Sequence, residues 1–193
     1  MSSEPQQSLS AASASDPSGR RVYDAYYTPP ALANALVSRL GNIRGLRALE
    51  PSGGAGAFVA AMTAAGASVT SIDRDALAPC RPDIVGDFLA HDVQYDIVVG
   101  NPPYGDAEAH VRHALTLAPR VAMLLRLAFL ETKGRLPFWA QHPPSLVSVL
   151  VQRPSFTGSG KTDSCAYGWF EWDSTWTLPP VLGWVSWRMG VDK

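Results

Sequence analysis

Short apolar runs and segments of helical spacing alternate along most of the chain. In the segment 29–41, two prolines are followed by apolar residues that recur on one helical face, and Gly41 ends the pattern, so we expect a helix there. Further helices fit 57–65 and 107–117. The apolar runs have the length of strands and lie at 46–49, 68–72, 84–85, 97–99, 121–127 and 146–151.

The order of these segments predicts the fold class. Strands that alternate with helices need right-handed crossovers, which produce a mostly parallel sheet in an α/β protein. Two aromatic-rich runs, at 167–172 and 181–187, have no helical segment between them. We expect these two runs to be antiparallel additions at the edge of the sheet.

Composition divides the chain into a tail and one domain. Residues 1–21 are rich in Ser, Ala, Gln and Pro and contain a single Leu, so they cannot bury enough apolar surface to offset the entropy of ordering. We predict that they are disordered. Residues 22–193 contain no stretch long enough for a second domain. The chain as a whole is 46% hydrophobic and 17% charged, which excludes wholesale disorder.

The basic residues are clustered, although the net charge is only −1. Between residues 112 and 161 there are seven basic residues and one acidic residue, which gives this segment a local charge of +6. Such a segment either receives phosphate groups or forms a set of solvated helix faces.

Membrane, disulfide and metal sites are not indicated. No apolar run is long enough to span a bilayer, and the first twenty residues lack the apolar core of a signal peptide, so we expect a cytoplasmic protein with no membrane partner. Cys80 and Cys165 are isolated, which favours reduced thiols over a disulfide or a zinc site. The four histidines have no metal-ligand spacing, so no metal is predicted.

A glycine-dense loop at 50–58 connects the first strand to a helix. Because glycine has no Cβ, a ligand can approach the backbone N–H groups of this loop beside the amino end of the helix. A tight structural turn would use the same residues. Asp73, about twenty residues further on, ends the next strand, where an acidic residue can bind ribose hydroxyls or cap the following helix.

A carboxylate and an aromatic residue, Asp87 and Phe88, follow the third short strand. They could hydrogen-bond to an adenine ring and stack on it. The alternative interpretation is a turn whose Phe lies in the core.

The most specific signal is the tetrapeptide Asn101-Pro102-Pro103-Tyr104, which follows an apolar strand and Gly100. At average residue frequencies it occurs by chance in roughly one chain of this length per thousand. Pro102 forces Asn101 into an extended conformation, and neither proline has an N–H group, so the turn presents acceptors. The alternative is an Asx-Pro turn at the end of a strand.

This turn suits chemistry on a planar amine. The Asn101 side-chain oxygen and the Pro102 carbonyl could accept hydrogen bonds from one exocyclic NH2 group, while the Tyr104 ring lies against the base or amide. Two fixed acceptors would draw the amine toward tetrahedral geometry and direct its lone pair at an electrophile. After alkyl transfer the nitrogen is strongly acidic, which explains an Asn rather than a stronger base.

Segments 50–56 and 101–104 together resemble the S-adenosylmethionine-dependent amino-methyltransferases, specifically the DNA adenine-N6 methyltransferases. The segment 26–30 is similar to that family's first cofactor motif, and 153–158 and 167–170 are similar to short, often phage-encoded members. The resemblance implies a class I (Rossmann-like) methyltransferase fold, a three-layer sandwich whose mostly parallel seven-stranded sheet has an antiparallel edge.

The resemblance also implies S-adenosylmethionine as the cofactor, with its methionine end at 50–56, its ribose at Asp73 and its adenine at Asp87 and Phe88. The catalytic residues would be Asn101, Pro102, Pro103 and Tyr104. The cofactor-binding residues would be Tyr27, Thr28, Pro29, Glu50, Pro51, Ser52, Gly53, Gly54, Gly56, Phe58, Asp73, Arg74, Asp87, Phe88 and Asn101.

DNA is the partner that the resemblance implies. A base inside a duplex cannot reach a pocket at the sheet, so the target base would be flipped out or already unpaired. Arg135, Arg153 and Lys161 are candidate phosphate contacts. The family places an aromatic residue against the flipped base, and the candidates here are Phe138, Trp139, His142 and Phe156.

The source of sequence specificity and two alternatives to DNA methylation stay open. The chain leaves no room for a separate target-recognition domain, so sequence specificity would come from short loops, from a partner or from a homodimer. The expected setting is the cytoplasm of a bacterial or phage-infected cell. An RNA base or a protein glutamine could replace adenine in DNA, because the turn can hold any planar amine or amide. A non-catalytic binding or regulatory subunit would be expected to have a broken cofactor or catalytic loop, and neither loop is broken.

Overall fold

The computed structural model describes residues 26–156 and 162–188. Most of the predicted domain lies within these ranges. The predicted disordered tail, residues 1–21, and the predicted phosphate contact Lys161 lie outside them.

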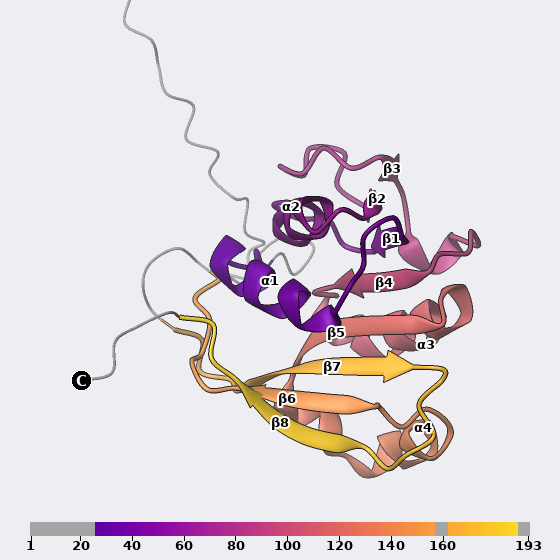
Figure 1. Cartoon of the computed structure of the whole chain (residues 1–193), viewed down its shortest axis with the longest axis vertical. Coiled ribbons are helices and arrows are strands. Elements are labelled where there is room, and N and C mark those ends of the chain that lie inside the picture. Colours follow the sequence, from indigo (N-terminus) through magenta and orange to yellow (C-terminus); the bar gives the residue numbers. More distant parts are fainter. Residues whose placement is uncertain (1–25, 157–161, 189–193) are drawn as a thin grey trace, which may run out of the picture.

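One mixed sheet organises the domain (Figure 1). Its strands are β1 (Arg47–Glu50), β2 (Ser68–Asp73), β3 (Ile84–Val85), β4 (Ile97–Gly100), β5 (Arg120–Arg126), β6 (Leu146–Leu150), β7 (Tyr167–Asp173) and β8 (Val181–Val185). Their order across the sheet is β3-β2-β1-β4-β5-β7-β6-β8. All the strands that the apolar runs predicted are therefore present.

The strand directions confirm a mostly parallel α/β sheet with an antiparallel part and correct two details. The described sheet has eight strands, not the seven predicted. β7 is antiparallel to both β5 and β6, but β8 pairs in parallel with β6, so the run at 181–187 is not the antiparallel strand expected. β7 and β8 do run in opposite directions, as expected for consecutive strands. However, β6 lies between them in the sheet, so β8 pairs with β6, which runs in the same direction as β8. That placement is set by tertiary pairing and not by local pattern.

Helices cover the two faces of the sheet. They are α1 (Pro30–Val37), which continues into the 3-10 turn η2 (Ser38–Leu40), α2 (Ala57–Ala64), α3 (Ala107–Leu117) and α4 (Leu136–Gln141). The first three match the predicted helices, whereas α4 was not predicted. Among the described residues, no helix is long and apolar enough to cross a membrane.

The core has two parts, one on each face of the sheet. Alternation along β7 shows this directly: Trp169 faces the α1 and α2 side, where its ring stacks on Phe58 at 5.6 Å, and Phe170 faces the other side. Leu32 and Leu36 of α1 are completely buried, as is Val111 of α3. The sheet therefore forms the middle of three layers, as predicted.

Candidate active site

The loops that carry the predicted chemistry meet where the parallel strands end. We call this side of the sheet the carboxyl edge. β1 ends at Glu50, β2 at Asp73, β4 at Gly100 and β5 at Arg126. Because β1 lies between β2 and β4 in the sheet, the glycine loop, Asp73 and the Asn101 turn are brought together. In parallel α/β sheets, ligands bind at this edge.

The glycine loop is shaped by close approach of its neighbours. Gly54 and Gly56 have left-handed backbone angles, with φ of 51° and 81°, and Gly56 is the N-cap of α2. The Gly54 N–H donates to Asp73 Oδ2 at 2.8 Å. A Cβ on Gly53 would lie 2.6 Å from the sulfur of Cys80. These glycines are thus required by the turn itself, which joins Asp73 to the loop.

Glu50 is an acidic side chain with only 2% of its surface exposed. It accepts one hydrogen bond, from the backbone N–H of Ser52 at 3.2 Å. Burial raises the pKa of Glu50 well above its ordinary value, and the nearby charge of Asp73 raises it further. A Cβ on Gly100 would overlap the Glu50 carboxylate, so Gly100 makes room for it. A buried carboxyl of this kind is suited to a cationic ligand, whose charge would favour its ionised form.

Asn101 is held by its amide nitrogen and leaves its oxygen available. Its Nδ2 donates to the Tyr26 carbonyl at 3.0 Å and to Thr28 Oγ1 at 3.2 Å. Its Oδ1 is buried and accepts no hydrogen bond from the described residues. A buried acceptor without a partner is costly, so it is a strong candidate for binding a donor on a ligand. The same contacts tie the 26–30 motif to the catalytic turn.

Tyr104 lies in a cluster of aromatic rings at the carboxyl edge. Its ring centroid is 5.3 Å from that of Tyr26, 5.5 Å from that of Tyr167 and 6.4 Å from that of Phe156. The Arg126 guanidinium lies 4.5 Å from the centroid of the Tyr104 ring. Burial raises the pKa of Tyr104, so its hydroxyl stays neutral.

Of the four residues predicted to stack on a base, the structure brings Phe156 to Tyr104. Phe138 is completely buried in the core, and Trp139 packs beside it. The carbonyl of His142 accepts a hydrogen bond from the Trp172 indole N–H at 3.0 Å. Trp172 pairs with Val121 near the start of β5, so His142 lies at the edge of the sheet opposite Asn101. A segment that precedes a parallel strand must lie at the amino end of that strand, so its side chains cannot reach a site at the carboxyl edge.

Two residues predicted to bind the cofactor belong to the core. Phe58 is 3% exposed and stacks on Trp169, and Phe88 is 2% exposed and packs against the rings of His110 and His113. For Phe88 the alternative interpretation, a core Phe at a turn, describes the structure. Each Phe lies next to a site loop in the sequence, but its ring packs in the core, where it buries more apolar surface than it would at an open ligand site.

Three predicted polar residues are bonded to other protein groups. Arg74 forms an ion pair with Asp87 at 2.8 Å, and this hydrogen bond lowers the pKa of Asp87. Arg135 lies 3.6 Å from Glu108 and donates to three backbone carbonyls, those of Ala128, Phe129 and Glu131. Its guanidinium therefore stabilises a turn, which makes it a poor phosphate contact. Arg153 is exposed on the loop that follows β6.

Sequence reasoning missed Arg126, Tyr167 and Cys80. Arg126 lies in the basic segment 112–161, and its position at the end of a predicted strand was the available signal. Cys80 closes over the glycine loop, where its N–H donates to the Gly54 carbonyl at 3.0 Å. Burial raises the pKa of the Cys80 thiol to about 11, so it is protonated at neutral pH.

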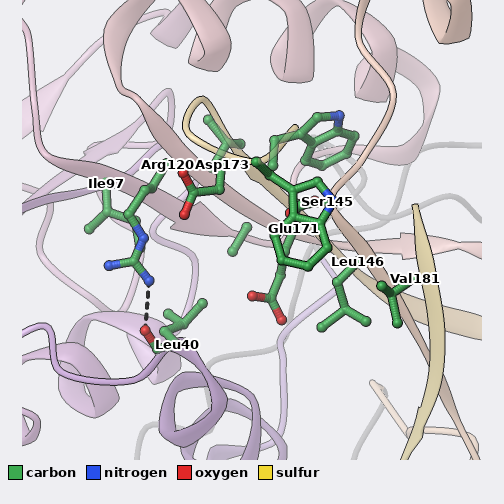
Figure 2. Close-up of a pocket in the computed structure, with 12 residues that line it drawn as sticks. Leu40, Ile97, Arg120, Ser145, Leu146, Glu171, Asp173 and Val181 are labelled. Atoms are coloured by element: carbon green, nitrogen blue, oxygen red, sulfur yellow. Dashed lines mark hydrogen bonds between the residues drawn. The ribbon is translucent and has the colours of Figure 1, made fainter. Parts of the chain in front are cut away.

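A cavity of about 260 Å³ lies at the opposite side of the sheet, which we call the amino edge (Figure 2). There Arg120 begins β5 and donates to the Leu40 carbonyl at 2.6 Å. Glu171 lines the same cavity, and burial raises its pKa while the charges of Arg39 and Arg120 lower it. Within the described ranges, no group of three or more His, Cys, Asp or Glu residues could hold a metal ion.

Comparisons with known proteins identify the fold. No family model matches the chain. A proposed RNA methyltransferase from Pyrococcus horikoshii is similar in structure, with a TM-score of 0.65 and 18% identity over 77% of this chain and 86% of that one. The type I restriction-modification methyltransferase subunit of Streptococcus thermophilus has a TM-score of 0.66 and 15% identity over 84% of this chain, which spans only 47% of the subunit.

A third similar structure contains a cofactor product. It is the magnesium protoporphyrin IX methyltransferase of Synechocystis with bound S-adenosylhomocysteine, which has a TM-score of 0.52 and 16% identity over 74% of this chain and 81% of that one. At these identities the comparisons establish the class I methyltransferase fold that the sequence predicted.

Proposed function

We propose that the chain is an S-adenosylmethionine-dependent methyltransferase that acts on the exocyclic N6 amine of adenine in DNA. The observation that carries the proposal is Asn101, whose Oδ1 is buried and accepts no hydrogen bond from the described residues while its Nδ2 is fixed. An oxygen held in this way is suited to binding an NH2 group that the protein itself does not supply.

The residues around the glycine loop fit the cofactor. The loop joins Asp73 at Gly54, and the buried Glu50 carboxyl has no cation among the groups that shift its pKa. Glu50 would bind the methionine ammonium group, and Asp73, already bonded to Gly54, would bind the ribose hydroxyls. When bound, S-adenosylmethionine supplies an electrophilic methyl group on a sulfonium. Similar folds include one with bound S-adenosylhomocysteine, which supports this choice of cofactor.

The chemistry at the amine follows from the turn. Asn101 Oδ1 and the Pro102 carbonyl would accept the two hydrogens of the target NH2 group, localise its lone pair and orient it toward the methyl donor. This interaction strengthens as the nitrogen becomes cationic, so it stabilises the transition state more than the ground state. The methylated nitrogen then loses a proton to solvent without a dedicated base. The target base would have to be flipped out or unpaired.

A second candidate substrate is an RNA base, because one similar structure is a proposed RNA methyltransferase. The similar restriction-modification subunit favours DNA and also a partner that supplies specificity. A protein glutamine is the weaker alternative, since its amide needs no basic surface.

The experiment that tests the proposal supplies tritiated S-adenosylmethionine with single-stranded DNA, duplex DNA, RNA and protein in parallel. Nucleoside analysis of the labelled polymer should find N6-methyladenine in DNA. Label in RNA or protein alone would move the proposal to that substrate. The absence of label in every sample, together with undetectable cofactor binding by calorimetry, would reject methyl transfer.

A further inference from the structure

Arg126 is a cation at the proposed active site that forms no direct ion pair with a described carboxylate. It is the last residue of β5, at the carboxyl edge, and its side chain is half-buried. Among the described residues, the ion pairs are those of Arg74, Arg112 and Arg135, so no carboxylate lies within 4.0 Å of Arg126. Arginine stays charged at any physiological pH. A half-buried charge without a counter-charge is costly, so it needs a reason.

The contacts of Arg126 are all with aromatic groups of the site. Its guanidinium carbon lies 4.5 Å from the centroid of the Tyr104 ring and 5.8 Å from that of Tyr26. Its Nε donates to the Tyr167 hydroxyl at a long 3.4 Å, and that hydroxyl donates to Asp163 at 3.1 Å. These contacts orient the guanidinium over Tyr104, next to the turn that holds Asn101. Asp163, whose pKa the charge of Arg126 helps to lower, is reached only through the Tyr167 hydroxyl, so no carboxylate pairs with Arg126 directly.

We propose that Arg126 is a substrate-binding residue that contacts a backbone phosphate of the target nucleotide, and that the substrate is therefore a nucleic acid rather than a protein amide. The inference rests on the proposed function, because it places the target amine at Asn101. In the free protein the planar guanidinium covers the Tyr104 ring. A base that stacks on Tyr104 takes that place, and Arg126 moves to the phosphate that the base carries with it.

Phosphate is the ligand that fits best, for two reasons. A guanidinium matches the fork geometry of phosphate oxygens, and a phosphate supplies the direct ionic partner that no described carboxylate provides. A glutamine side chain would bring an amide to Asn101 but no charge to Arg126. Of the two predicted phosphate contacts among the described residues, Arg135 is already bonded to Glu108 and three carbonyls, and Arg153 is exposed on the loop that follows β6.

A purely structural role makes a different prediction. If Arg126 only braces the aromatic cluster, its planar group and its hydrogen bond matter, and its charge does not. Arg126→Gln keeps a planar polar end without charge, whereas Arg126→Lys keeps the charge without the planar fork. Arg44→Met is a matched control, because Arg44 is exposed on the loop before β1, at the amino edge.

The test measures binding of a fluorescent single-stranded oligonucleotide with one adenine between 50 and 200 mM salt, without cofactor. Each lost phosphate contact should reduce the slope of log affinity against log salt by about 0.7. Arg126→Gln should show that reduction and bind about tenfold more weakly at low salt. Arg126→Lys should keep the slope, and Arg44→Met should match the wild type.

Cofactor affinity, melting temperature and turnover separate this inference from the proposed function. Methyl transfer by the wild type tests the function, and the salt slope tests Arg126. Turnover by Arg126→Gln should show a KM raised about tenfold with kcat within a few-fold. A folded Arg126→Gln with normal cofactor affinity and an unchanged salt slope would overturn the inference. If Arg126→Gln folds poorly, Arg126→Lys decides, because a folded Arg126→Lys with a reduced slope would also overturn it.

Discussion

The two edges of the sheet each contain a buried carboxyl group, and they differ in what surrounds it. Burial raises the pKa of both Glu50 at the carboxyl edge and Glu171 at the amino edge. Near Glu171, the charges of Arg39 and Arg120 lower the pKa, so the protein compensates that carboxyl in part, although its pKa stays above the ordinary value. Near Glu50, the charged group is Asp73, which adds to the shift. The carboxyl edge thus has a carboxyl with no cation among the groups that shift its pKa, whereas two arginines already act on the carboxyl at the amino edge.

The other polar groups differ between the edges as well, although Glu171 Oε1 at the amino edge is also buried without a hydrogen bond from the described residues. At the carboxyl edge, Asn101 has a buried oxygen that accepts no bond from the described residues, and Arg126 has no ion pair within them. At the amino edge, Arg120 donates to the Leu40 carbonyl inside the cavity. Unsatisfied polar groups cost stability, and proteins concentrate them where a ligand completes them.

The largest expected effect is on turnover at the carboxyl edge. Asn101→Ala should lower the rate of methyl transfer about 100- to 1000-fold, because it removes an acceptor that acts mainly in the transition state. Cofactor affinity, measured by calorimetry, should change no more than a few-fold. Asn42→Ala, at an exposed position before β1, is the control and should retain activity. Equal losses of turnover and cofactor affinity in Asn101→Ala would show that Asn101 belongs to the cofactor site instead.

The second effect compares two strand glycines. Gly100→Ala should reduce the free energy of unfolding by about 1–3 kcal/mol, since the new Cβ would overlap the Glu50 carboxylate and lie 3.0 Å from Pro51 Cδ. Gly183→Ala in β8 meets its nearest atom at 3.7 Å and should be neutral or slightly stabilising. Urea denaturation of both variants measures the difference. Equal stabilities would mean that the carboxyl edge is not tightly packed around Glu50.

A third effect concerns Asp73. Asp73→Ala should weaken cofactor binding about tenfold, because it removes the proposed ribose ligand and the acceptor for the Gly54 N–H. Asp75→Ala removes a carboxylate two residues away, which accepts from the Leu77 N–H, and should bind the cofactor normally. Calorimetric titration with S-adenosylhomocysteine distinguishes the two. An unchanged affinity for Asp73→Ala would remove this residue from the site.

The position of the proposed site at the carboxyl edge could be predicted from the sequence, because the site is built from short segments that directly follow strands. Each predicted apolar run became a strand, and the glycine loop, Asp73 and the Asn101 turn follow strands β1, β2 and β4. In a parallel sheet such loops meet at one edge, so their convergence follows from the order of elements alone.

The parts that the sequence does not reveal depend on tertiary placement. Phe58 and Phe88 lie next to site loops in the sequence, but a residue type does not reveal whether its ring points to the core or to a ligand. The position of β6 between β7 and β8 decides that β8 is parallel, and no local pattern encodes it. Arg126 and Tyr104 are 22 positions apart in the numbering, and only the folded sheet brings the guanidinium over the ring.

The smallest expected effect, on thermal stability, tests the comparison of the two carboxyl groups most directly. Between its ordinary pKa and its raised pKa, each group keeps a proton in the folded state that it loses in the unfolded state, so stability falls as the pH rises through that window. Glu50→Gln and Glu171→Gln should each remove one such contribution and raise the melting temperature at neutral pH by at most about 4 °C. The change should be smaller for Glu171→Gln, because Arg39 and Arg120 already offset part of the effect of burial on Glu171.

Saturating cofactor sharpens this test, because a cationic ammonium bound at Glu50 would favour its ionised form. Melting curves of the wild type and both variants, recorded from pH 4 to pH 8, should show that the cofactor flattens the pH dependence in the wild type and in Glu171→Gln. In Glu50→Gln, the dependence that remains should be that of Glu171 and should not respond to the cofactor. A cofactor response that disappears with Glu171→Gln would instead place the cationic ligand in the cavity at the amino edge, because only a group in contact with the ligand can change its pKa on binding.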